Sequence, residues 1–151
     1  MNYRNQWPAL PGDYVTYSTS FDFGLKNIGI AIGQEITFTS QTFYSVSANN
    51  GEPILDELDK VVTNWKPDLF LVGNPLNMDG TISKIKAKSD KFSNFIEERY
   101  NISVELVDER LSTREALDRI NSKNEYLINN SDNRHSVAAQ VILEHWFREQ
   151  S

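Results

Sequence analysis

The chain contains no cysteine, and this absence excludes disulfide bonds, thiolate metal sites and cysteine nucleophiles together. It also has no apolar run near the roughly 20 residues that a membrane-spanning helix needs. The first twelve residues lack the apolar segment after a basic start that marks a secretory signal peptide. We therefore expect a cytoplasmic protein that has no contact with a membrane.

Basic residues are also few, since 15 lysines and arginines stand against 21 aspartates and glutamates, for a net charge of -6. Proteins that bind nucleic acid through a broad electrostatic field are usually basic, so this balance argues against a general nucleic-acid binder. It does not exclude an enzyme that meets phosphate groups locally, through metal ions and a few lysines.

The 151 residues are enough for one domain with a single core. Residues 1–16 are rich in asparagine, proline and glycine and predict an irregular extension before a domain of residues 17–151. At the start of that domain, residues 17–23, 28–33 and 37–46 predict strands, the second with isoleucines alternating with glycine and alanine. The short links between these strands favour an antiparallel meander.

Helices and strands alternate in the rest of the chain. Residues 53–65 predict a helix with Pro53 in its first turn, and residues 68–73 predict a strand that is covered on both faces. A second helix, capped by Ser83, turns Ile85, Phe92, Phe95 and Ile96 inward; a strand over residues 104–108 and a helix over residues 135–147 follow. A capping box beginning at Ser112 predicts a further helix start. This order predicts an α/β three-layer sandwich with a mixed five-stranded sheet.

Acidic side chains at strand ends are the first candidates for chemistry. Asp22 lies in a strand-like run, where an ionised carboxylate is costly unless it is paired or binds a cation; the alternative is an ordinary turn aspartate. Asp108, Glu109 and Arg110 close the strand over residues 104–108. Neighbouring acids point to opposite faces of a strand, so only one of them can easily share a site with Asp22. A charged strand exit without function remains the alternative.

Two further groups of residues lie near helix starts. His135 and Asp132 stand at the beginning of the last predicted helix, where they either meet a metal or serve as polar first-turn and capping residues. Lys84, Lys88 and Lys91 follow the loop at residues 73–80 at a spacing that places them on one helix face. That ridge either meets phosphates or is only a solvated surface.

Four segments taken together, in this order, carry a family resemblance. They resemble the signature segments of the YqgF family, and the resemblance extends from about residue 18 to about residue 147. It implies a ribonuclease H-like fold and a nuclease that trims the 5′ end of pre-16S rRNA in ribosome biogenesis. The family has also been described as Holliday junction resolvases. The segments are residues 22–31, DFGLKNIGIA; 72–81, VGNPLNMDGT; 108–116, DERLSTREA; and 136–143, SVAAQVIL.

The resemblance also implies roles for single residues. Asp22 matches the acid of the first strand, and Glu109, with Asp108 as its neighbour, matches the acid of the third segment. His135 stands where the family commonly has aspartate, and Asn74 stands where it usually has leucine. An imidazole suits Mn²⁺ better than Mg²⁺, because hard cations prefer oxygen ligands.

The mechanism expected from this resemblance is metal-assisted phosphodiester hydrolysis. Asp22 and Glu109, with His135 or Asp132, would hold two divalent ions, Mg²⁺ or Mn²⁺, that activate water and stabilise the leaving oxygen. The flanking RNA backbone, free or within a ribosomal particle, would be held by the ridge lysines and by Asn77, Arg110 and Arg114.

Three alternatives stay open at this stage. A Holliday junction resolvase acting on branched DNA would use the same acids but would need a homodimer rather than a monomer. A nucleic-acid-binding relative without catalysis would keep the fold alone. An ATP-binding relative is disfavoured, since the chain is too short for a two-domain cleft.

Overall fold

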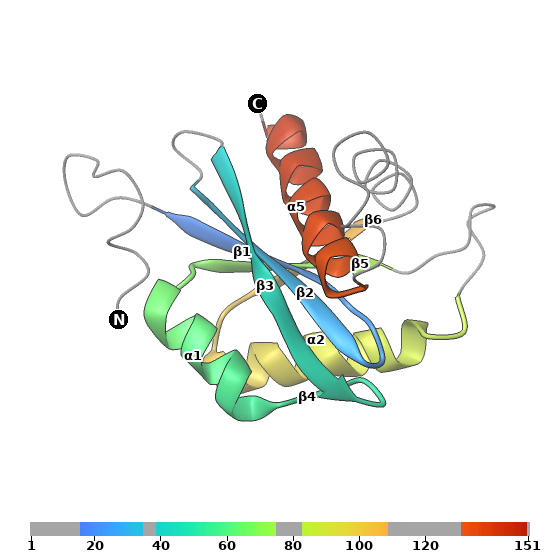
Figure 1. Ribbon diagram of the computed structural model, residues 1–151. Helices are drawn as coiled ribbons and strands as arrows, with labels where there is room; N and C mark the ends of the chain where they lie inside the picture. Colours follow the sequence, from blue (N-terminus) through green and yellow to red (C-terminus); the bar gives the residue numbers. More distant parts are fainter. Residues whose placement is uncertain (1–15, 35–38, 75–82, 109–130, 151) are drawn as a thin grey trace.

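A computed structural model describes residues 16–34, 39–74, 83–108 and 131–150 of the chain. Its centre is a six-stranded sheet with the strand order β4-β3-β2-β1-β5-β6 (Figure 1). No helix in these described segments is long and apolar enough to cross a membrane. The strands are β1 (Tyr17–Asp22), β2 (Asn27–Gln34), β3 (Thr39–Asn49), β4 (Glu52–Pro53), β5 (Leu69–Asn74) and β6 (Val104–Asp108); the helices are α1 (Leu55–Trp65), α2 (Lys86–Tyr100) and α5 (Ser131–Gln150).

The predicted mixed sheet is confirmed. β1, β2 and β3 pair antiparallel as a meander, whereas β5 pairs parallel to β1 and β6 pairs parallel to β5. The carboxyl ends of β1, β5 and β6 therefore lie along one edge of the sheet. In open α/β sheets this edge is where ligands bind.

The predicted number of five strands is wrong, because a short hairpin adds β4. Asn50 and Gly51 both have positive φ angles, 52° and 89°, as a two-residue hairpin turn requires. Their turn pairs Ala48 with Pro53 in the register of β3 and β4. Pro53 is thus a strand residue and not, as predicted, part of a helical first turn; α1 begins two residues later.

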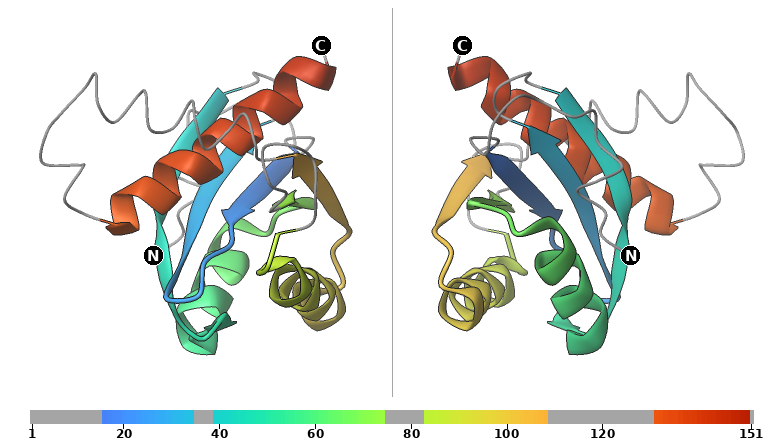
Figure 2. Two further views of the ribbon diagram at one scale, coloured as in Figure 1. Left: turned by 90° about the vertical axis from the view of Figure 1, so that its right-hand side faces the viewer. Right: turned by 90° about the vertical axis from the view of Figure 1, so that its left-hand side faces the viewer.

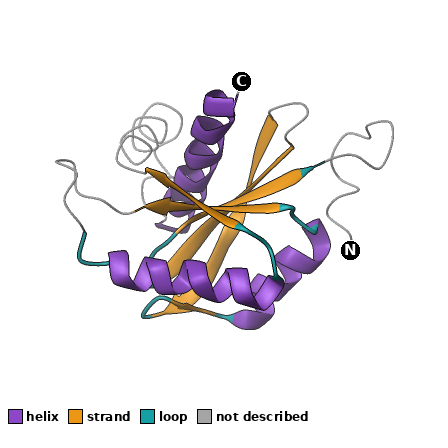
Figure 3. Ribbon diagram, turned by 180° about the vertical axis from the view of Figure 1, so that it is seen from behind, coloured by secondary structure: helices purple, strands orange, loops and turns teal. Residues whose placement is uncertain are grey.

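Helices cover both faces of the sheet, α1 and α2 on one side and α5 on the other (Figures 2 and 3). On the α1–α2 side, the rings of Phe21, Phe70 and Phe92 meet edge to face, with centroids 5.4 Å apart in both Phe21 pairs. Trp65 of α1 is 1% exposed in the same cluster. This aromatic layer is the larger part of the core, because each ring buries a large apolar surface.

The α5 side is built on small residues, as the alternation in β2 predicts. Gly29, Ala31 and Gly33 form this face, and a Cβ at Gly33 would lie 2.7 Å from both Leu143 and Phe147 of α5. The absent side chains let α5 approach the strand closely, and at Gly33 this sets where the carboxyl-terminal half of α5 lies.

Other predicted elements shift at their ends. The third strand, Thr39–Asn49, extends three residues beyond its predicted end at Val46, and α5 begins at Ser131, four residues before the predicted start. Residues 37 and 38, where the third strand was predicted to begin, lie outside the described segments. Ser83 accepts a hydrogen bond from the Ile85 backbone at 3.1 Å, but α2 begins only at Lys86. Phe95 does not face inward as predicted, since it is 36% exposed. The predicted helix start at residues 112–115 lies outside the described segments.

Candidate active site at the carboxyl ends of β1, β5 and β6

Asp22 ends β1 with its side chain 13% exposed. Alternation along the strand places it on the same face as Ser20, whose hydroxyl donates to the carbonyl of Ala139 in α5. Phe21 points to the opposite, aromatic side. A carboxylate this little exposed needs a partner or a cation. The low exposure of Asp22 argues against the alternative of an ordinary turn aspartate.

The partner of Asp22 is His135, 113 residues further along the chain. Its Nδ1 lies 2.5 Å from Asp22 Oδ2, and the imidazole is 31% exposed. Two glycines make this approach possible. A Cβ at Gly29 would collide with the backbone of His135, and a Cβ at Gly24 would lie 2.9 Å from the Cε1 of its ring. His135 is a full turn inside α5 rather than at its start, because the helix begins at Ser131.

Asn74 and Asp108 occupy the neighbouring strand ends, where they are paired in register. Asp108 is exposed, and its neighbour Val107 packs in the cluster beneath α5. Alternation along β6 gives Asp108 the opposite face from Val107, and therefore from Asp22. Asp108 also lines a cavity with His145 and Trp146 of α5, and neither Asp22 nor His135 lines that cavity.

The α2 side of this edge carries a lysine that the sequence analysis missed. Lys86 Nζ lies 3.1 Å from Asn74 Oδ1 and 3.1 Å from Asp90 Oδ1. The spacing of Lys86 and Asp90, four residues apart on one helix, was a readable sign of an ion pair. No local sequence pattern could show that Lys86 also contacts Asn74 at the end of β5.

The remaining predicted residues fall into three groups. Lys84 precedes α2, whereas Lys88 and Lys91 lie on it, and all three are exposed. Lys88 reaches across to the β3–β4 hairpin, where its Nζ donates to Asn50 Oδ1 at 2.7 Å. Asp132 lies in α5 with its side chain outside the described part. The other four, which are Asn77, Glu109, Arg110 and Arg114, lie outside the described segments altogether.

The donor atoms of the pair suit a divalent cation. A carboxylate oxygen and an imidazole nitrogen are both ordinary ligands of Mn²⁺, whereas Mg²⁺ favours oxygen alone. Within the described segments, no group of three or more histidines, aspartates or glutamates is close enough to hold a metal. A metal held by this pair would therefore require further ligands.

A cluster of groups with shifted pKa values lies away from this site, between α1 and α2. Hydrogen bonds from Arg99, at 2.9 and 2.7 Å, and from Tyr100 lower the pKa of Asp59 from 3.8 to about 2. Burial and the hydrogen bond to Asp59 raise the pKa of Tyr100. The cluster joins α1 to α2, and its role is structural.

The chain is similar to a known protein family and to solved structures. Residues 17–149 match the RuvX family, which is described as Holliday junction resolvase. The chain belongs to the RuvX (YqgF) family. Its RuvX relatives include a protein of Aeromonas hydrophila that is 45% identical over 130 residues, covering 86% of this chain and 93% of the relative. A relative in Mannheimia succiniciproducens is 43% identical over 132 residues, covering 87% and 94%. Both carry the name "Putative pre-16S rRNA nuclease".

Solved structures support the fold of this RuvX family member. The Fowlpox virus resolvase, solved with Holliday junction DNA, superposes with a TM-score of 0.59 at 15% identity, covering 89% of this chain and 99% of the resolvase. RuvC of Thermus thermophilus, in complex with a Holliday junction substrate, gives a TM-score of 0.54 at 12% identity, covering 89% and 96%. The predicted ribonuclease H-like architecture is confirmed.

Proposed function

We propose that this protein is a metal-dependent nuclease that hydrolyses phosphodiester bonds of pre-16S rRNA, processing its 5′ end in the cytoplasm. The RuvX family membership and the names of its relatives support a nuclease. The observation that carries the proposal is the contact of Asp22 with His135, at the edge of the sheet where ligands bind. This contact brings a poorly exposed carboxylate and an imidazole together at that edge.

Asp22 would hold the metal through a carboxylate oxygen, and His135 would supply a ring nitrogen. Glu109 and Asp132 are the proposed sources of the further oxygen ligands. Bound divalent ions would lower the pKa of an attacking water and stabilise the leaving oxygen. We propose Glu109 rather than Asp108 as the ligand from the third segment, because alternation along β6 gives Asp108 the opposite face from Asp22.

The lysines of the α2 side would hold the RNA backbone. Lys86 is fixed by Asn74 and Asp90 beside the carboxyl end of β5, so its ammonium group occupies one defined position. Lys88 and Lys91 are exposed further along the same helix. Contacts of this kind position a substrate without reading its sequence, which suits a protein whose net charge of -6 argues against broad electrostatic binding.

The test is cleavage of an end-labelled RNA that spans the 5′ end of 16S rRNA in its precursor, with Mn²⁺ or Mg²⁺. Wild-type protein should cut the RNA, and Asp22→Asn should reduce the rate by at least about 100-fold, as expected when a metal ligand is lost. Asp56→Asn, an exposed aspartate in the first turn of α1, is the matched control and should leave the rate unchanged. Equal rates for wild type and Asp22→Asn would refute the proposed site.

Metal binding gives a second readout that needs no substrate. Calorimetric titration should show a Mn²⁺ site in the wild type that is absent from Asp22→Asn. His135→Asp should shift preference towards Mg²⁺, since it replaces nitrogen by the oxygen that hard cations favour. A Mn²⁺ site with the same affinity in all three proteins would place the metal elsewhere.

A second candidate is favoured by the description of the RuvX family as Holliday junction resolvase. A labelled four-way DNA junction belongs in the same cleavage assay. Cutting of the junction alone would replace RNA by branched DNA as the substrate, and a dimer in solution would then be expected, since such a substrate is symmetric. Tight binding of RNA without cutting of either substrate would show a binding protein that has lost catalysis.

A further inference from the structure

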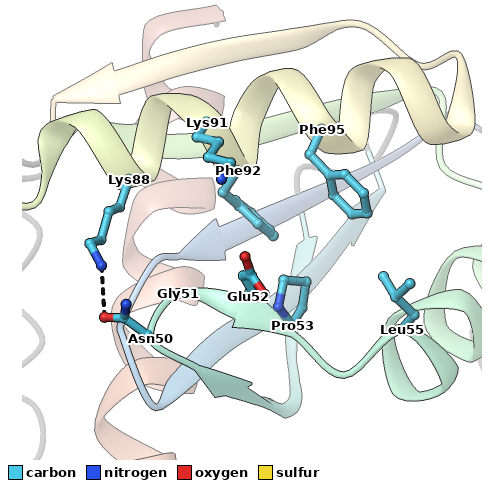
Figure 4. A pocket seen from close by; sticks show the side chains of 9 residues that line it. All are labelled: Asn50, Gly51, Glu52, Pro53, Leu55, Lys88, Lys91, Phe92 and Phe95. Carbon is cyan, nitrogen blue, oxygen red and sulfur yellow. Dashed lines mark hydrogen bonds between the residues drawn. The ribbon is translucent and has the colours of Figure 1, made fainter.

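A cavity of about 360 Å³ lies between the β3–β4 hairpin and α2, outside the Asp22–His135 site. Figure 4 shows the hairpin on one side and the side chains of α2 on the other. This volume lies within the range of small-ligand pockets, roughly 300–1,000 Å³. The lining residues come from the hairpin, from the start of α1 and from α2: Asn50, Gly51, Glu52, Pro53, Leu55, Lys88, Lys91, Phe92 and Phe95.

Exposed apolar side chains line part of this cavity. Phe95 is 36% exposed and Leu55 is 39% exposed, so two of the five exposed large hydrophobic side chains in the described segments line this cavity. The ring of Phe95 points from α2 towards Pro53 and Leu55 (Figure 4). An exposed aromatic ring facing an apolar wall offers a platform on which a flat ring can stack.

The polar groups stand around this platform. Lys88 and Lys91 provide two exposed positive charges on α2, and Lys88 is held at the mouth of the cavity by Asn50. On the opposite side the carboxylate of Glu52 points towards α2 (Figure 4). Lysines suit phosphate oxygens, whereas a carboxylate accepts hydrogen bonds from amino groups such as those of nucleobases.

We propose that this cavity binds one unpaired nucleotide of the nucleic-acid substrate, with its base against Phe95 and its phosphates at Lys88 and Lys91. The proposal rests on the proposed function, which makes the substrate a nucleic acid. An acidic peptide would also meet the two lysines, but its side chains would face the carboxylate of Glu52. A base with an exocyclic amino group instead finds a hydrogen-bond acceptor in that carboxylate.

The cavity is connected to the active site by one residue. Phe23 follows Asp22 directly, and its ring lies 5.5 Å, centroid to centroid, from that of Phe92, which lines the cavity. A Cβ at Gly51 would lie 2.8 Å from the same Phe23 ring. The proposed nucleotide therefore lies beside the active site and not within it.

Binding measurements in the Asp22→Asn background separate this site from catalysis. The probe is a fluorescein-labelled ten-nucleotide single-stranded RNA, compared with a chain of the same length made of abasic residues. Phe95→Ala should weaken RNA binding by about 5- to 100-fold, the range for a lost base–aromatic stack, and leave abasic binding unchanged. Phe95→Tyr should keep RNA affinity within about twofold, since it keeps the stacking face.

Lys91→Ala should weaken binding of both probes and reduce the slope of log affinity against log salt by about one. Lys60→Ala, an exposed lysine of α1 away from the cavity, is the control and should change neither. Equal RNA affinity in Phe95→Ala and wild type would overturn the proposal, as would equal losses for RNA and abasic probes. Displacement of the RNA by a glutamate-rich peptide would assign the cavity to acidic peptides and also overturn it.

The experiments distinguish an error in the proposed nuclease function from an error in the proposed nucleotide site. A protein that loses RNA affinity with Phe95→Ala but cleaves neither RNA nor DNA retains the nucleotide site and is not a nuclease. A protein that cleaves RNA, and whose RNA affinity is unchanged by Phe95→Ala, is a nuclease without this nucleotide site. Far-ultraviolet circular dichroism of each variant establishes that it is folded.

Discussion

Replacement of Gly29 by alanine tests whether the small-residue face of β2 places His135. The added Cβ would collide with the carbonyl group of His135 and the amide nitrogen of Ser136. These atoms belong to the backbone of α5 and cannot rotate aside. The helix must therefore move away from the strand, on the order of 1 Å, before a tolerable contact is restored.

Gly33→Ala is the matched control, because it adds the same methyl group to the same face of the same strand. There the new Cβ would meet the ends of the Leu143 and Phe147 side chains at 2.7 Å, and side-chain ends can rotate. We expect Gly29→Ala to lower the free energy of unfolding by about 3 kcal/mol or more, at the upper end of overpacking. For Gly33→Ala the steric contact should lower the free energy of unfolding by about 1 kcal/mol. Alanine also reduces the conformational entropy of the unfolded chain, which should restore roughly 0.4–1 kcal/mol of that loss.

Urea unfolding followed by circular dichroism measures both values, with unchanged slopes against urea as the condition for comparing them. If the movement carries His135 away from Asp22, Gly29→Ala should also lose about 100-fold in cleavage rate, as a displacement of about 1 Å near reacting groups can cause. Gly33→Ala should stay within a few-fold of the wild-type rate. Equal destabilisation by the two alanines would refute the described packing of α5 on β2.

Three further predictions concern the core and its links. Phe21→Ala, which empties the centre of the aromatic layer, should lower the free energy of unfolding by about 3–5 kcal/mol in urea titration; a loss below 1 kcal/mol would contradict its full burial. Ser20→Ala removes the hydrogen bond to the Ala139 carbonyl and should cost about 1 kcal/mol in the same assay. Because the folded pKa of Asp59, about 2, lies below its usual 3.8, the ion pair with Arg99 stabilises the protein above pH 3.8, and this contribution is lost as the pH falls through 2. The two side chains are 37% and 36% exposed, so Asp59→Asn should cost less than about 1 kcal/mol at pH 7. An undiminished difference from wild type well below pH 2 would refute the assignment.

Sequence patterns predicted most of the architecture because they are local. The alternation of isoleucine with glycine and alanine in β2 defined both faces of the strand before any partner was known. β4 was missed although Asn50-Gly51 is a hairpin signal, because Pro53 was assigned to a helical first turn. The outward position of Phe95 could not be predicted, since apolar spacing along a helix does not show where the neighbouring layer ends.

The candidate site was predictable in part. Asp22 stood out because a carboxylate in a strand requires an explanation, whereas its contact with His135 joins residues 113 positions apart. That contact depends on how closely α5 can approach β2. The signal was present in Gly24 and Gly29, whose lack of side chains leaves room for His135. A glycine in a strand, however, does not by itself reveal which segment comes close to it.

Histidine at position 135 changes how this site is held together. The resemblance to the YqgF family implies aspartate at this position, and two carboxylates about 4 Å apart would repel each other by about 4 kcal/mol at an effective dielectric constant of 20. Such a pair needs a cation between its members to be stable. In this chain the imidazole of His135 contacts Asp22 directly at 2.5 Å, so the two groups attract each other without a metal. The strand end and the helix can therefore adopt their positions without a metal, and a metal that bound at this pair would have to compete with the contact.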